Sequence, residues 1–128
     1  VVIGADQILS LDGEVFRKPS SDDEARAQLL RLRGRSHELH SAVCVLKKGH
    51  AATFTDKATL TMRNFSDEFL SWYLDMAGAA ILTSVGAYHF EGLGIHLFSD
   101  VEGDYFTILG LPVLPVLAEL RRLAVLAE

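Results

Sequence analysis

Cysteine is almost absent from the sequence, because Cys44 is the only one among 128 residues. A single cysteine excludes an intramolecular disulfide, and its rarity is typical of proteins from a reducing compartment, so we expect a cytoplasmic protein. The neighbours of Cys44, from Ala42 to Leu46, are apolar. They favour a small buried hydrophobic residue over a nucleophile.

Positive charge is also scarce. The 12 lysines and arginines stand against 17 aspartates and glutamates, which gives a formal net charge of −5. This charge argues against binding to nucleic-acid polymers, although it leaves room for a local cationic pocket for phosphates. No apolar run approaches the roughly 20 residues that span a bilayer. Val1-Val2-Ile3 lacks the charged flank and cleavage site of a signal peptide. We therefore expect neither a nucleic-acid nor a membrane partner.

The chain has enough apolar residues for the core of one domain, since 49% of its 128 residues are hydrophobic. Strand and helix patterns mix along it, which predicts an α/β fold. Ser21 with Glu24 forms a capping box at a helix start, and Gly34 stands where that helix ends. Ser66 is the expected cap of a second helix. Pro112 suits the first turn of the last helix, whereas Pro115 favours a start nearer residue 114. The expected strands are 1–9, 14–16 (a hairpin arm after a turn at 12–13), 39–46 (apolar on both faces), 52–62 and 93–101; the expected helices are 21–34, 67–76 and 113–126.

Two charged residues occupy positions suited to phosphate chemistry. Asp6 lies at the carboxyl end of an apolar strand, where α/β sheets open onto clefts, so its carboxylate can bind a metal or activate water. Lys18 precedes Pro19, and its compact ammonium suits a polyphosphate. A turn-forming aspartate and a solvated lysine are the alternative interpretations of these two residues.

The five histidines show no zinc-ligand spacing. His37 and His40 are three positions apart, which places them on opposite faces of a strand. The chain also lacks a P-loop and a complete dinucleotide-binding glycine motif.

Four segments carry the strongest functional signal: Gly4-Ala5-Asp6-Gln7, Lys18-Pro19, Gly86-Ala87-Tyr88-His89-Phe90-Glu91-Gly92, and Gly103-Asp104-Tyr105 followed by Gly110-Leu111-Pro112. Their order and spacing resemble the Maf family, named for septum formation, whose members hydrolyse nucleoside triphosphates to the monophosphate and pyrophosphate. The resemblance runs from Val1 to about Leu123. It implies a hydrolase of nucleotide metabolism with a mixed sheet and flanking helices, similar to the Maf/ITPase-like fold.

One part of the family pattern has no match in the sequence. Maf proteins open with a Ser-x-Ser-x-Arg-Arg-type loop on a strand and helix, and nothing here matches it. The resemblance therefore implies that residues 1–128 are a single Maf-like domain, truncated at its N-terminus and lacking that strand–helix segment. We expect the first strand to need a partner from the segment, and the chain alone to have little or no activity.

The resemblance assigns catalytic roles to two residues. Asp6 matches the family's general-base aspartate, which would orient the attacking water and help hold a divalent cation such as Mg, Mn or Co. Lys18 matches the lysine of the Lys-Pro motif and would be a phosphate ligand.

Gln7 and Glu91 match the positions that help choose the base. The branch of the family that acts on dTTP and UTP typically has Thr and Gln there, whereas this chain resembles the branch that acts on 7-methyl-GTP. A guanine edge presents N1–H and N2–H₂ as adjacent donors that a carboxylate can accept, and methylation adds positive charge. Tyr88 can stack on a base or simply pack; an exposed loop carboxylate is the alternative for Glu91.

These observations predict a pyrophosphatase acting on 7-methyl-GTP. One alternative is the same reaction on UTP, dTTP or a broader set of triphosphates. Another is a non-catalytic nucleotide-binding or septum-regulating protein. The sequence leaves the oligomeric state open, a homodimer being one alternative.

Overall fold

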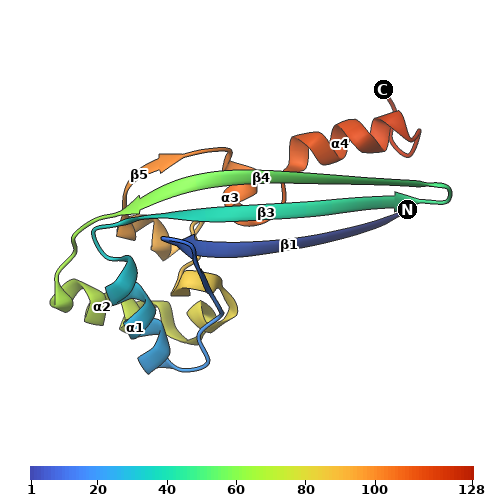
Figure 1. Cartoon of the computed structure of the whole chain (residues 1–128). Helices are drawn as coiled ribbons and strands as arrows, with labels where there is room; N and C mark the ends of the chain where they lie inside the picture. Colours follow the sequence, from blue (N-terminus) through green and yellow to red (C-terminus); the bar gives the residue numbers. More distant parts are fainter.

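Five strands form one sheet in the order β2-β1-β3-β4-β5. The structure is a computed structural model that describes residues 1–128. It confirms the expected combination of a sheet with flanking helices, and every strand pairing is antiparallel. The strands are β1 (Val2–Leu11), β2 (Glu14–Phe16), β3 (Ser36–Lys47), β4 (His50–Met62) and β5 (Phe98–Glu102) (Figure 1).

A tight turn sets the first hairpin. Asp12 and Gly13 both have positive φ, 50° and 84°, which is the backbone that matches the twist of two paired strands. β2 therefore folds back onto β1 as predicted, with Leu9 opposite Phe16. This short strand pairs only with the end of β1, so the edge of β1 before Leu9 carries no strand.

β3 and β4 form a long hairpin that extends beyond the body of the molecule (Figure 1). Burial alternates along β3, with Val43 and Val45 buried and the intervening residues more exposed. The expectation that both faces of this strand are buried is therefore wrong. Cys44 lies on the less covered face and is half-buried, because its cross-strand neighbour Thr53 is exposed and no helix covers it there.

Helices α1 (Asp22–Leu32) and α2 (Asp67–Ala77) begin at the caps that the sequence predicts. The Ser21 hydroxyl accepts from the N–H of Glu24, and the Ser66 hydroxyl accepts from the N–H of Phe69. Both helices bury their apolar sides in the main core, which the sheet supplies with Leu9, Leu39 and Leu60 among others (Figure 1).

The segment after α2 differs from the expectation. The strand expected over 93–101 is confirmed only from Phe98 onward, as β5, because residues 93–97 form a 3₁₀ helix, η3 (Leu93–Leu97). Gly94 packs so tightly that a Cβ there would lie 2.5 Å from the His89 carbonyl oxygen, and this contact holds a turn where a strand would need to be straight. The other short helices are η1 (Gly78–Thr83), η2 (Val85–Ala87) and α3 (Tyr105–Leu109), none of which the sequence pattern predicts.

The last helix, α4 (Val113–Arg122), starts directly after Pro112. Pro115 is its third residue, where the missing N–H has no helical partner, so the expected shift to residue 114 does not occur. Val116 and Leu120 pack on Val43 and Val45 and form a second, smaller core along the β3–β4 hairpin (Figure 1).

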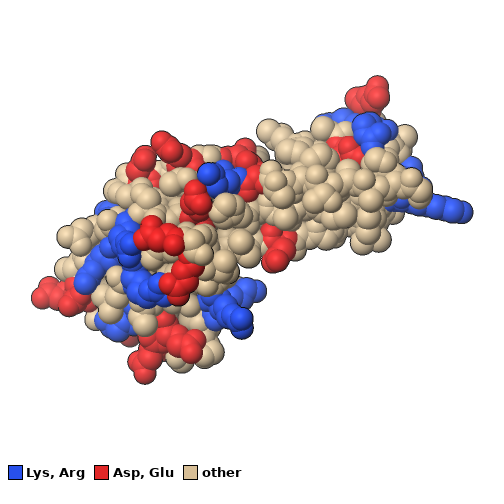
Figure 2. Space-filling view, viewed as in Figure 1, with Lys and Arg blue, Asp and Glu red and all other residues tan.

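Charges of both signs intermingle over the body of the molecule, and the middle of the extended hairpin is largely free of them on the face shown in Figure 2. No helix of the structure combines the length and the apolar character needed to cross a membrane.

Candidate active site

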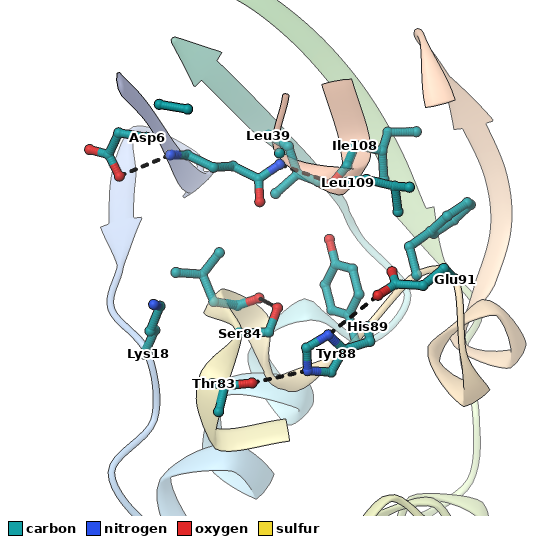
Figure 3. Close-up of a pocket in the computed structure, with 15 residues that line it drawn as sticks. Asp6, Lys18, Leu39, Thr83, Ser84, Tyr88, His89, Glu91, Ile108 and Leu109 are labelled. Atoms are coloured by element: carbon teal, nitrogen blue, oxygen red, sulfur yellow. Dashed lines mark hydrogen bonds and ion pairs between the residues drawn. The ribbon is translucent and has the colours of Figure 1, made fainter. Parts of the chain in front are cut away.

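One pocket of about 330 Å³ is lined by all five candidate site residues of the sequence: Asp6, Gln7, Lys18, Tyr88 and Glu91. Its walls come from β1, from the segment after β2, from the 83–91 region and from the end of α3. In Figure 3, Asp6 and Lys18 lie on one side of the pocket, and His89 and Glu91 lie on the other. Among these five residues, the two farthest apart in the sequence are Asp6 and Glu91, which are separated by 85 positions (91 − 6).

Asp6 lies in the middle of β1 rather than at the end of a strand, so the expected position is wrong. Its side chain is nevertheless exposed, and β1 has no neighbouring strand on its outer edge before Leu9. The carboxylate Oδ1 accepts a hydrogen bond of 2.9 Å from the backbone N–H of Gln7. This bond fixes one carboxylate oxygen at the rim of the pocket, and no ion pair occupies the other.

Lys18 stands on the exposed segment between β2 and α1. No carboxylate lies within ion-pair distance of its ammonium. Figure 3 shows Lys18 below Asp6 at the same open side of the pocket. A cation and an anion held there without a mutual ion pair provide complementary contacts for a phosphate chain and a water molecule.

Gln7 has a structural role that sequence reasoning missed. Its amide nitrogen donates to the carbonyl oxygens of Thr107 at 3.0 Å and Ile108 at 2.9 Å, and reaches the Ser41 hydroxyl at 3.3 Å. These bonds tie β1 to the last turn of α3, where the Thr107 carbonyl also accepts from the N–H of Gly110 and from the Ser41 hydroxyl. Only the amide oxygen remains to face a ligand, so Gln7 can offer the pocket an acceptor but no donor.

Tyr88 forms part of the pocket wall, yet it is only 4% exposed and its ring packs edge-on against Phe98 at 4.9 Å. Its hydroxyl hydrogen bonds with Nε2 of His37 at 2.8 Å. Burial raises the pKa of the Tyr88 hydroxyl and lowers the pKa of His37 to about 4, so both groups are neutral at pH 7. The sequence leaves open whether Tyr88 stacks on a base or packs inside the protein, and this geometry favours packing.

His37 is the buried partner that sequence reasoning missed. It is 1% exposed and its Nδ1 has no hydrogen-bond partner. The alternation of the strand does indicate this burial, because His37 lies on the same strand face as the buried residues Leu39, Val43 and Val45.

Glu91 lies next to the end of the loop from Gly86 to Gly92, and its exposed side chain lines the pocket. Its Oε1 lies 3.6 Å from Nδ1 of His89. The loop starts at Gly86, where φ is 77° and a Cβ would lie 2.7 Å from Leu9 Cδ1, so only glycine fits. The glycine thus lets the loop approach β1 closely enough to face Asp6 and Gln7.

The pocket offers little to a metal ion by itself. Nowhere in the structure do three or more histidine, cysteine, aspartate or glutamate side chains gather as ligands. Mg²⁺ is commonly held by one or two carboxylates together with substrate phosphates. Asp6 lies on the same side of the pocket as Lys18 and can supply one carboxylate ligand to a cation that binds together with the phosphates. It does not form a complete metal site by itself.

The family profile described as Maf-like protein matches residues 1–123. The chain belongs to the Maf family. This confirms the resemblance of its motifs, and a five-stranded sheet with flanking helices is consistent with the Maf fold.

Three relatives illustrate what this Maf chain is similar to. The nucleoside triphosphate pyrophosphatases of Paramagnetospirillum magneticum and Bradyrhizobium diazoefficiens are 56% and 57% identical over 122 residues, which are 94% of this chain. The 7-methyl-GTP pyrophosphatase of Bartonella quintana is 43% identical over the whole chain. The chain spans 63%, 60% and 65% of the lengths of these three proteins, respectively.

Proposed function

We propose that the protein carrying this chain hydrolyses nucleoside triphosphates to the nucleoside monophosphate and pyrophosphate. The observation that carries the proposal is the single pocket with Asp6 and Lys18 on one side and Glu91 on the other. Such an arrangement has one side for a phosphate chain and a separate side for a base. The names of the pyrophosphatase relatives support the same reaction.

In the proposed reaction, Asp6 accepts a proton from a water molecule as the water oxygen forms a bond to a phosphorus of the triphosphate. The bridging phosphorus–oxygen bond breaks, and pyrophosphate leaves with the electron pair of that bond. Lys18 stabilises the negative charge that develops on the phosphate oxygens. Asp6 would also hold a divalent cation such as Mg, Mn or Co, which when bound would neutralise further phosphate charge. General-base catalysis contributes about 10²–10⁴-fold to such rates.

We further infer that the preferred base is 7-methylguanine. Glu91 and the amide oxygen of Gln7 are both hydrogen-bond acceptors, because the Gln7 nitrogen is occupied by α3. Guanine presents adjacent N1–H and N2–H₂ donors, whereas uracil presents one N–H between two carbonyls. The positive charge of the methylated ring adds attraction to Glu91. The name of the Bartonella relative supports this preference.

The test is a panel of 7-methyl-GTP, GTP, UTP and dTTP incubated with the protein and Mg²⁺, with monophosphate and pyrophosphate both quantified. We expect equal amounts of the two products and a kcat/KM for 7-methyl-GTP roughly 5- to 150-fold above that for UTP, because a bound uracil would cover Glu91 and leave its carboxylate without a donor. A preference for UTP would overturn the choice of base. Nucleotide binding without pyrophosphate release would instead indicate a non-catalytic, septum-regulating or other nucleotide-binding protein.

A further inference from the structure

His89 lines the pocket but has no part in the proposed reaction. Its Nε2 lies 2.9 Å from the carbonyl oxygen of Ala80 and 3.2 Å from the hydroxyl oxygen of Thr83. The Thr83 hydroxyl itself donates to Ala80 at 2.7 Å. Because a carbonyl oxygen only accepts, the hydrogen of the neutral imidazole belongs on Nε2. The nitrogen that gains or loses a proton is therefore Nδ1.

That second nitrogen faces the carboxylate of Glu91, with Nδ1 and Oε1 3.6 Å apart (Figure 3). When Nδ1 is protonated, His89 and Glu91 form an ion pair. When Nδ1 is unprotonated, its lone pair faces the carboxylate, and Glu91 keeps its full capacity to accept hydrogen bonds from a ligand. The charge state of His89 thus decides how much of the Glu91 carboxylate is free to accept hydrogen bonds from a ligand.

The other groups around His89 leave this pair isolated. The 3₁₀ helix η1 presents only the Ala80 carbonyl and the Thr83 hydroxyl to the ring. The end of α3 contributes the apolar Ile108 and Leu109 to the pocket. The remaining charged groups of the pocket are Asp6 and Lys18 on the opposite side (Figure 3).

We propose that His89 is a positioning residue for Glu91, and that a base which donates to Glu91 displaces the proton of His89 Nδ1 when it binds. The inference rests on the proposed function, because it needs a base at Glu91. A cationic base such as 7-methylguanine gains most from this exchange, since it replaces one positive partner of the carboxylate by another.

The experiment is calorimetric titration of the protein with 7-methyl-GMP, the product of the proposed reaction, at several pH values and in buffers of different ionisation enthalpy. We expect the affinity of the wild type, relative to that of His89→Gln, to rise with pH by up to about tenfold per unit, as required when up to one proton is released from His89 on binding. In His89→Gln this additional pH dependence should be absent, so the number of protons released on binding should be smaller than in wild type by up to one. His40→Gln is the matched control, because His40 also faces a carboxylate, that of Glu38 at 3.2 Å, but does not line the pocket.

Two outcomes separate this inference from the proposed function. Binding of 7-methyl-GMP with the same pH dependence in wild type and His89→Gln overturns the role of His89 and leaves the proposed function intact. If neither 7-methyl-GMP nor any triphosphate of the panel binds, the proposed function is overturned, and the role of His89 with it.

Discussion

At the scale of single residues, Lys18 is the one lysine or arginine that lines the pocket. Lys18→Ala should raise KM and lower kcat together, because the ammonium contacts phosphates in both the ground state and the transition state. Arg17→Ala is the control, since the neighbouring Arg17 is exposed and does not line the pocket. Steady-state kinetics with the preferred triphosphate provide the measurement. A Lys18→Ala protein that loses only stability would show that Lys18 is structural.

Glu91 is the residue whose charge distinguishes bases in the proposal. Glu91→Gln replaces one carboxylate oxygen by a donor, so the ratio of kcat/KM for 7-methyl-GTP to that for UTP should fall by roughly 5- to 150-fold. Glu102→Gln, an exposed carboxylate of β5 outside the pocket, should leave the ratio unchanged. An unmoved ratio in Glu91→Gln would refute base selection by this side chain.

His37 makes the stability of the fold depend on pH. Its pKa of about 4 in the folded protein lies below the ordinary value of 6.5, so the unfolded chain binds more protons between these values. Stability should therefore fall as the pH drops from 6.5 to 4, by about 3 kcal/mol from this residue. Glu119, whose pKa is lowered to about 2 by its hydrogen bond with Arg122, loses its contribution mainly below this window, between its ordinary value of 4.5 and about 2.

Denaturant unfolding of wild type and His37→Gln at pH 7, 5.5 and 4 measures this contribution. The variant is expected to be less stable at pH 7, yet its stability should depend less on pH over this range. Parallel pH dependences of the two proteins would show that His37 is not held neutral by the fold.

At the scale of elements, the loop that carries Glu91 depends on a close glycine contact. A Cβ on Gly94 would lie 2.5 Å from the backbone oxygen of His89, which cannot move aside as a flexible side chain can. Gly94→Ala should shift the 89–92 loop, destabilise the protein by about 1–3 kcal/mol and weaken nucleotide binding. Gly92→Ala is the matched control, because its Cβ would lie 3.8 Å from the same oxygen. Thermal unfolding and nucleotide titration should separate the two variants, and equal behaviour would contradict this account of the loop.

Several elements could be predicted from the sequence because their signals are local. The serine caps at Ser21 and Ser66 and the Asp12-Gly13 turn each act within four residues, and the structure places them as expected. α3 has local signals too, with Asp104 as its cap and Gly110 at its end. Its five residues are too short for an apolar periodicity to appear, so the helix was missed.

Other features depend on contacts between segments that are distant in the sequence, so no local sequence pattern predicts them. The turn at Gly94 results from packing against the His89 backbone, which the alternation of apolar residues over 93–101 does not reveal. Gln7 holds residues 100 and 101 positions away, so its structural role is visible only in the folded chain. A Gln7→Thr change would therefore loosen α3 in addition to altering the pocket.

At the scale of the whole molecule, the sheet and the 83–91 region bring the separate motifs into one pocket. Composition and periodicity predict the α/β class, but they do not predict that these residues line one pocket. The resemblance to the Maf family predicted it, because the family's motifs imply a shared site. The position of Asp6 in the middle of an open strand edge, rather than at a strand end, comes only from the pairing of β1.

The most direct test of the central claim is pyrophosphate release from 7-methyl-GTP and UTP by the wild-type protein and by Asp6→Asn. Asparagine keeps an oxygen that can accept from the Gln7 N–H, so the edge of β1 should remain intact. We expect the wild type to release pyrophosphate and monophosphate in equal amounts. Asp6→Asn should bind the nucleotide normally and turn it over about 10²–10⁴-fold more slowly. Turnover of Asp6→Asn at the wild-type rate, or release of phosphate in place of pyrophosphate, would contradict the account.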